Sequence, residues 1–143
     1  MRAKALKAID SAKPEELLEN LADGRAKLYV IRKGLELRKK YPALFHGGQY
    51  TPLYADGGRE DHIVAFWLSD SSSALTAVAP RLFFNLMGAD DLAPLGKKAW
   101  GDAALPLKGS CVNVLTGERH EADGRLPLAE LLRRFPVALL LRA

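Results

Sequence analysis

The chain has 143 residues, which is enough for one domain with a single hydrophobic core. Hydrophobic residues make up 48% of the sequence and charged residues 27%, so the composition indicates a globular protein and excludes a disordered one. The formal net charge of +4 keeps a basic interaction module among the possible classes.

Cysteine usage and apolar runs exclude several further classes. Cys111 is the only cysteine, which excludes an internal disulfide and a cysteine-based zinc cluster and predicts a reducing, cytoplasmic location. The longest apolar runs, residues 63–68 and 137–141, are far shorter than the roughly 20 residues that span a bilayer. The basic N-terminus lacks the apolar core of a signal peptide. We therefore expect no membrane partner.

Helical patterns come first in the chain. Residues 1–12 are rich in Ala and Lys and predict a helical lead-in. Residues 14–21 predict a helix, because a proline and two acids occupy its first turn. A longer helix is predicted over residues 25–40, after the break at Asp23-Gly24 and before Pro42, which disfavours the α conformation of the residue in front of it.

The helix over residues 25–40 has two neighbouring apolar stripes at helical spacing. The first stripe consists of Leu28, Ile31 and Leu35, and the second consists of Val30, Leu37 and Tyr41. So wide an apolar arc predicts burial against something large. The basic residues of this helix alternate with Glu36, which is typical of a solvated helix face, and we expect no nucleic-acid partner.

After Gly47-Gly48 the pattern becomes that of extended chain. Residues 49–54 predict a strand in which Pro52 marks an edge or a bulge. Near-continuous apolar runs separated by a polar turn predict a central antiparallel hairpin. The further expected elements are a loop with a short helix at 81–87, paired strands at 111–115 and 119–122, a short helix at 127–134 and a final buried strand at 136–141. The order of elements predicts an α+β fold, with N-terminal helices followed by an antiparallel β-sandwich.

Eight phrases of this sequence resemble, in the same order, the C-terminal region of the maltooligosyltrehalose synthases, a family of the α-amylase superfamily (glycoside hydrolase family 13). They are residues 23–28, 41–45, 50–53, 78–82, 100–102, 115–118, 126–132 and 135–141. Two positions depart from the family pattern: Cys111 stands where a tryptophan is usual, and Ala103 where a threonine is expected.

The resemblance implies an organisation and a role. Residues 1–46 resemble the last helical segment of a catalytic (β/α)8 barrel, and residues 47–143 resemble its C-terminal β-sandwich domain. The intact enzyme converts the reducing-end α-1,4 linkage of a maltooligosaccharide to an α,α-1,1 linkage, without a cofactor. The family's catalytic carboxylates belong to earlier barrel strands, so this chain alone is expected to be inactive. Its expected partner is that barrel, or a second copy bound through the helix over residues 25–40.

The chain's own polar residues do not form a catalytic or metal-binding pattern. The adjacent pairs Glu60/Asp61 and Asp90/Asp91 do not converge, because neighbouring side chains on an extended strand point to opposite faces. Retaining glycosyl transfer needs two carboxyl groups roughly 5–5.5 Å apart. The three histidines lack ligand spacing. We therefore expect no catalytic residue and no metal.

Carbohydrate binding is the alternative function, in a stand-alone β-sandwich module for α-glucans. Exposed aromatic rings stack on sugars, and the candidates are Trp100, Tyr50 and Tyr54, with Arg81 as a polar anchor. Trp100 could instead be a plug that covers one end of the sandwich, and Arg81 could pair with a carboxylate at the sheet edge. Trp67 lies within an apolar run and is expected in the core.

Overall fold

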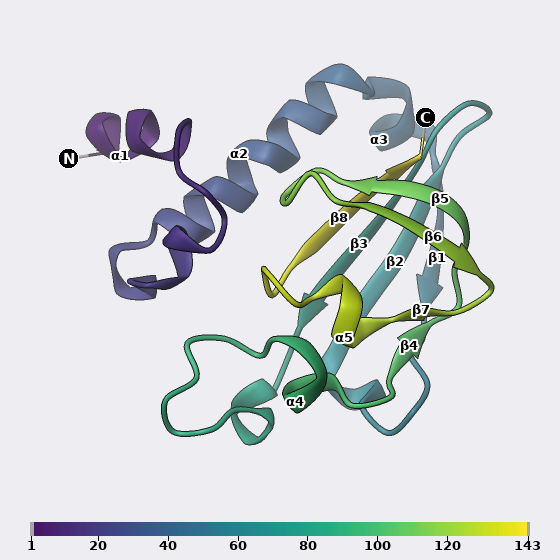
Figure 1. Cartoon of the computed structure of the whole chain (residues 1–143). Coiled ribbons are helices and arrows are strands. Elements are labelled where there is room, and N and C mark those ends of the chain that lie inside the picture. Colours follow the sequence, from purple (N-terminus) through teal and green to yellow (C-terminus); the bar gives the residue numbers. More distant parts are fainter. Residues whose placement is uncertain (1, 143) are drawn as a thin grey trace.

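Helices precede an antiparallel sheet in the computed structural model, which describes residues 2–142 (Figure 1). The helices are α1 (Arg2–Ile9), α2 (Arg25–Lys40), α3 (Pro42–Gly47), α4 (Gly96–Trp100) and α5 (Leu128–Leu131). The strands are β1 (Gln49–Leu53), β2 (Ile63–Ser69), β3 (Ala74–Pro80), β4 (Ala104–Leu105), β5 (Lys108–Asn113), β6 (Arg119–Asp123), β7 (Leu126–Pro127) and β8 (Ala138–Arg142). This arrangement confirms the expected α+β class.

Six strands form one antiparallel sheet in the order β1-β2-β3-β8-β5-β6, and β4 and β7 form a second, two-stranded sheet. The predicted hairpin is the β2–β3 pair, in which Phe66 lies opposite Ala77. The predicted pairing after residue 111 is the β5–β6 hairpin. Strand β1 lies at the sheet edge, where the missing N–H of Pro52 does not remove a hydrogen bond between two inner strands. The last strand in the sequence, β8, lies between β3 and β5 and pairs with both of them.

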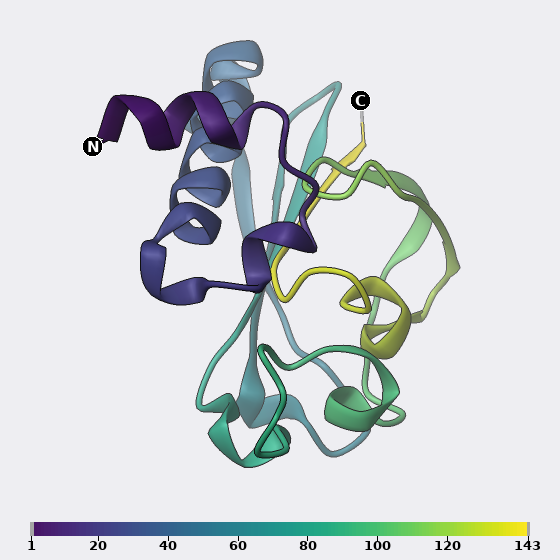
Figure 2. The same ribbon diagram turned by 60° about the vertical axis from the view of Figure 1, so that its left-hand side comes forward.

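The two faces of the large sheet are covered by different parts of the chain, because alternate side chains of each strand point to opposite faces. On one face, Val78 and Leu140 pack with α4, α5 and the β4–β7 pair. We call the opposite face, which carries Leu75 and Leu139, the outer face. Helices α2 and α3 lie against part of it. Figure 2 shows the N-terminal helices on one side of the sheet and α4 and α5 on the other.

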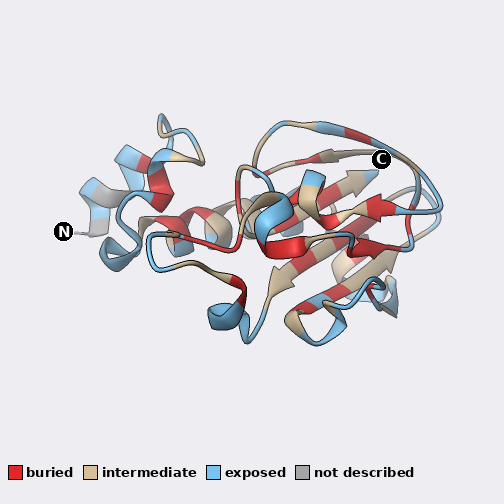
Figure 3. Cartoon of the chain, turned by 60° about the horizontal axis from the view of Figure 1, so that its bottom comes forward, coloured by how far each residue is buried: buried red, intermediate tan, exposed pale blue. Residues whose placement is uncertain are grey.

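The N-terminal segment shares a hydrophobic cluster with the β-region. Leu17 and Leu18 are buried together with Tyr29 of α2 and Phe135, which precedes β8. The Tyr29 hydroxyl donates a hydrogen bond of 2.6 Å to the carbonyl oxygen of Leu115, and its ring meets Phe135 edge to face. Burial raises the pKa of Tyr29, so the hydroxyl stays a donor. In Figure 3 the buried residues gather in the sheet and the segments that cover it.

Several local predictions were wrong in detail. Residues 14–21 form two 3-10 turns, Glu16–Leu18 and Leu21–Asp23, instead of one helix, because Asn20 has φ −139° and breaks the helical path. Pro42 ends α2 as predicted, but it also opens α3, where its missing N–H costs nothing.

The region after β3 also differs from its prediction. The short helix predicted at residues 81–87 is a 3-10 turn over Phe83–Leu86. Helix α4 and strand β4 follow it, and neither was predicted from the sequence. The later helix, α5, has only four residues instead of eight. No helix in the described part of the chain has both the length and the apolarity needed to cross a membrane.

An ion-pair network ties the N-terminal segment to the β-region. The Arg134 guanidinium binds the Glu15 carboxylate, and Arg133 contacts Glu118 at 2.5 Å. The hydrogen bond from Arg134 holds the pKa of Glu15 below its ordinary value. Burial works against ionisation of Glu118, but the hydrogen bond from Arg133 leaves its pKa lowered overall. Both groups therefore stabilise the fold when ionised.

We expect Glu15→Gln to reduce the acid sensitivity of the fold. Because the pKa of Glu15 is lowered in the folded state, its stabilisation is present above the unfolded-state pKa and is lost as the pH falls through the folded-state pKa. The pair is partly exposed, so at pH 7 the variant should lose less than about 1 kcal/mol, a fall in Tm of a few °C at most. The difference should shrink as the pH falls through the folded-state pKa of Glu15, and below that pKa the two proteins should melt together.

Thermal melts followed by circular dichroism between pH 7 and pH 3 measure this difference. The matched control is Glu19→Gln, which changes an exposed carboxylate on the same segment and should leave the pH profile unchanged. A constant offset in Tm between wild type and Glu15→Gln at every pH would contradict the ionic role of Glu15.

Candidate functional site

The carboxylates singled out in the sequence do not converge on a common point. Glu60 and Asp61 lie on an exposed 3-10 turn. Asp91 accepts hydrogen bonds from the Gly88 amide and the Lys98 ammonium, and the Gly88 amide is the main cause of its lowered pKa. A hydrogen-bonded carboxylate with a lowered pKa is poorly suited to act as a general acid, so Asp91 fits a structural role.

The histidines are also separate from one another. A ring nitrogen of His46 contacts the carbonyl oxygen of Pro42 in its own helix, and a ring nitrogen of His62 contacts the carbonyl oxygen of Leu82. His120 is buried on β6, and Glu130 lies 3.7 Å from its Nδ1 atom. Among the described residues there is no cluster of three or more His, Cys, Asp or Glu side chains able to hold a metal ion.

Trp100 is not available as a sugar platform. Its side chain is 0% exposed, at the centre of the core between α4 and the sheet. The indole N–H donates a hydrogen bond of 2.8 Å to the carbonyl oxygen of Pro94, which satisfies the one polar atom of the ring. Trp100 is thus buried instead of exposed, and its burial favours the alternative role as a plug that covers one end of the sandwich.

The other three carbohydrate candidates lie on the outer face of the sheet. Tyr50 is in phase with Pro52 on β1, and Tyr54 follows the strand directly in the same phase. Arg81 continues β3, because its amide donates a hydrogen bond to the carbonyl oxygen of His62. Tyr50 is 60% and Tyr54 77% exposed, and the ring of Tyr50 lies 5.3 Å from that of Phe66. Strand alternation places these residues on the same side of β1–β3, and we call this side the aromatic face.

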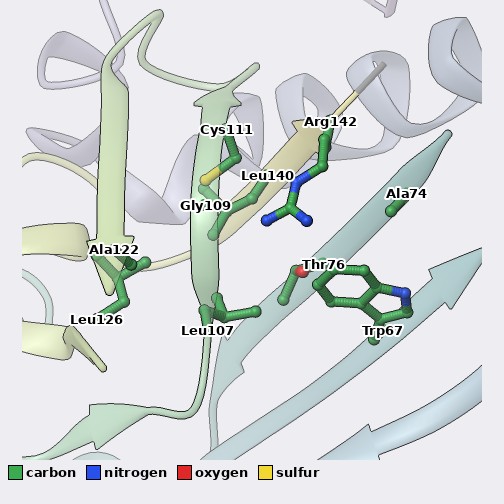
Figure 4. A pocket seen from close by; sticks show the side chains of 10 residues that line it. All are labelled: Trp67, Ala74, Thr76, Leu107, Gly109, Cys111, Ala122, Leu126, Leu140 and Arg142. Atoms are coloured by element: carbon green, nitrogen blue, oxygen red, sulfur yellow. The ribbon is translucent and has the colours of Figure 1, made fainter. Parts of the chain in front are cut away.

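A small recess lies on the opposite side of the sheet (Figure 4). Trp67 is half-buried there, not fully in the core as expected, and the Arg142 guanidinium lies 5.2 Å from its ring centroid. Arg142 also donates to the carbonyl oxygens of Lys108 and Ser110. A side chain at Gly109 would collide with this guanidinium, and its φ of +99° also favours glycine. The recess is about 10 Å³, close to the size of one water molecule, so it holds no sugar.

Cys111 also faces this recess. Burial raises the pKa of its thiol, which makes the thiolate scarce at neutral pH. The partly buried thiol packs against the core cluster.

An exposed apolar surface lies between α1 and α2. Leu6 of α1 faces Leu28, Ile31 and Leu35 of α2 across an open groove, whose two connected parts have volumes of about 430 and 520 Å³. Ile31 is 46% and Leu35 58% exposed. We call this surface the α1–α2 groove. The sequence predicted its α2 stripe but not Leu6, because residues 1–12 carry too few apolar residues to mark a contact.

The two sides of α2 have different surroundings. The side of the helix that carries Ala26, Tyr29 and Leu37 is buried against the sheet and the N-terminal turns. Leu17 and Leu18 cover this inner side, and Leu28 packs partly against the same cluster, while Ile31 and Leu35 stay exposed at the groove. The helix therefore has one side buried within the chain and one apolar side that Leu6 of α1 borders but leaves largely exposed.

Comparison with known proteins relates the chain to a segment of a much longer enzyme. It is 37% identical over 117 residues to a protein of Mycobacterium tuberculosis, found in strains CDC 1551 and H37Rv and described as "Putative maltooligosyl trehalose synthase". The match covers 81% of this chain but only 14% of those relatives. No family model matches the chain, and no solved structure matches it significantly.

The chain is thus homologous to a fragment of a protein described as "Putative maltooligosyl trehalose synthase". This homology confirms the family resemblance found in the sequence. Fold and comparison together define an α+β segment related to part of this enzyme.

Proposed function

We propose that this chain is the non-catalytic C-terminal part of a maltooligosyl trehalose synthase. The main support for this proposal is the 37% identity over 117 residues to the mycobacterial relative. The matched segment makes up 14% of the length of that relative. In this proposal the intact enzyme converts the reducing-end α-1,4 linkage of a maltooligosaccharide to an α,α-1,1 linkage. The chain contributes residues 1–46 as the last helical segment of the catalytic barrel and residues 47–143 as a sandwich-type C-terminal domain.

The polar groups of the chain support a structural role. Retaining glycosyl transfer needs two carboxyl groups about 5–5.5 Å apart across the scissile bond. Asp91 has its carboxylate occupied by Gly88 and Lys98, and Glu60 and Asp61 lie on an exposed turn. The catalytic acids are then expected in the other part of the enzyme, and the chain needs no cofactor for its role.

The exposed stripe of α2 supports docking to that other part. Ile31 and Leu35 remain about half exposed even though the opposite side of α2 is packed on the sheet. Full burial of such a side chain is worth roughly 1.5–3 kcal/mol, so a partner surface over the stripe would stabilise the assembly. An exposed apolar surface of this kind marks an interaction site. Cys111, as the only cysteine, agrees with assembly in a reducing, cytoplasmic environment.

The proposal predicts that this chain can replace the matched segment of the mycobacterial relative. A full-length chimaera carrying the 117 matched residues of this chain should form trehalosyl ends from maltopentaose, with kcat within about tenfold of the parent because the chemistry lies elsewhere. The chain alone should form none. Chromatography of the products measures both.

The chimaera also needs a control for folding. Its thermal melt should be cooperative, and a second chimaera with Ile31→Glu should lose activity or stability because the charge falls on the docking stripe. A chimaera that folds cooperatively but forms no trehalosyl product would contradict the proposed role, as would product formation by the isolated chain.

A stand-alone α-glucan-binding module is the second candidate, and the aromatic face favours it. Tyr50, Tyr54 and Arg81 share this face, which gives two exposed rings and one cation on the same side of the sheet. Such rings can stack on sugar rings, and the guanidinium can donate hydrogen bonds to hydroxyl groups.

Titration with maltoheptaose separates the two candidates. The structural role predicts no change in the tyrosine ring resonances below millimolar sugar. A micromolar dissociation constant that Tyr54→Ala abolishes would establish the binding module instead. The control is Phe84→Ala, which removes an 88% exposed ring outside the β1 strand and should leave any such binding intact.

A further inference from the structure

The α1–α2 groove has a shape that can accommodate one helix. Leu28, Ile31 and Leu35 lie at positions i, i+3 and i+7, which places them along one line of α2 over roughly 10 Å. Leu6 bounds the groove from the side of α1. A concave apolar channel with anchors over two helical turns is the form in which proteins receive an amphipathic helix.

The charge around the groove is strongly one-sided. Helix α2 has seven basic residues and one acidic residue, a net charge of +6, although the whole chain carries only +4. The single acid, Glu36, is engaged by Arg32 and Lys33, and Arg32 also binds Asp10 at 2.5 Å. Lys27 and Lys39 line the two ends of the groove and have no carboxylate within 4 Å in the described part of the chain.

This charge argues against the other occupants of the groove. A second copy of the chain would bring the same basic helix against this one, and like charges across an interface are unfavourable. A membrane-bound helix presents its apolar residues on a convex crest. Here the α2 stripe lies beside Leu6 of α1, so the apolar residues border an open groove between two helices.

We propose that the α1–α2 groove binds an amphipathic helix whose apolar stripe is flanked by acidic residues. This inference rests on the proposed function, in that the helix belongs to the catalytic portion of the same enzyme. The partner's leucine-like residues fill the space between Leu6 and the α2 stripe. Its carboxylates meet Lys27 at one end and Lys39 at the other, so that charge selects both the partner and its register.

Three fluorescein-labelled 18-residue peptides test the proposal on the intact chain. All are alanine-based helices with leucines at i, i+3 and i+7, flanked by glutamate, glutamine or lysine. Fluorescence anisotropy at low and high salt measures binding. We expect the glutamate peptide to bind at least tenfold tighter than the lysine peptide, with an advantage that shrinks as salt screens the charges.

Variants of the chain locate the site. Ile31→Asp should abolish binding, while Val64→Asp, which places the same charge on an exposed apolar residue of β2, should not change it. The pair Lys27→Glu and Lys39→Glu should reverse the preference in favour of the lysine peptide. Circular dichroism and thermal melts verify that each variant keeps the fold.

Three results would overturn the proposal: no binding of any peptide, equal binding of the glutamate and lysine peptides, or an effect of Val64→Asp equal to that of Ile31→Asp. Sedimentation of the chain with vesicles of equal parts phosphatidylglycerol and phosphatidylcholine would assign the groove to a membrane surface, and a dimer lost in Ile31→Asp would assign it to a second copy. Failure here is distinct from failure of the proposed function, which is decided by the activity of the chimaera.

Discussion

The packing of α2 on the outer face of the sheet is the constraint on which the rest of this structure depends. Leu37 meets Leu75 of β3 near one end of the helix, and Tyr29 meets Phe135 and Leu115 near the other. The buried hydrogen bond from Tyr29 contributes about 0.5–1.5 kcal/mol and fixes the rotation of the helix about its axis. That rotation decides which apolar stripe of α2 is buried and which remains for a partner.

The same contact explains why a segment related to about one seventh of a long enzyme forms a core of its own. Strand β8 lies in the middle of the sheet, so its residues are held between β3 and β5, and Leu139 and Leu141 pack beneath α2. The N-terminal turns are attached through Leu17, Leu18 and the pairing of Glu15 with Arg134. Both ends of the described chain thus depend on one helix–sheet contact, while the α1–α2 groove on the far side of α2 is left open.

Local chemistry made much of the fold predictable. Helix α2 has the predicted bounds because Gly24 and Pro42 mark its two ends, and β1 lies at the sheet edge as Pro52 indicated. The identity of the buried stripe was not predictable, since Leu28, Ile31 and Leu35 are as apolar as the residues that face the sheet. Periodicity shows that a helix has an apolar side, but the neighbour on that side comes from tertiary packing.

The site was less predictable than the fold, and Trp100 shows why. Lys97, Lys98 and two glycines around it suggested an exposed loop, but the chain forms α4 and turns the indole inward. The carbonyl oxygen of Pro94, six residues away, accepts its N–H and removes the cost of burial. Tyr50 and Tyr54 were recognisable because strand alternation alone places them on one face. Arg81 lies on the same side because its amide donates a hydrogen bond to the carbonyl oxygen of His62, which extends the pairing beyond β3. No sequence pattern predicts this hydrogen bond.

The central claim is that the apolar stripe of α2 is exposed in this chain and covered in the full enzyme, and the reactivity of a thiol at Leu35 tests it most directly. In a Cys111→Ser background, Leu35→Cys would be labelled with an aromatic disulfide reagent in the isolated chain and in the full-length chimaera, with Glu121→Cys on β6 as the exposed control. The account predicts that the thiol at position 35 reacts at the rate of the control in the isolated chain and at least tenfold more slowly in the chimaera. Equal rates at position 35 in both proteins would show that nothing covers the stripe and would contradict the account.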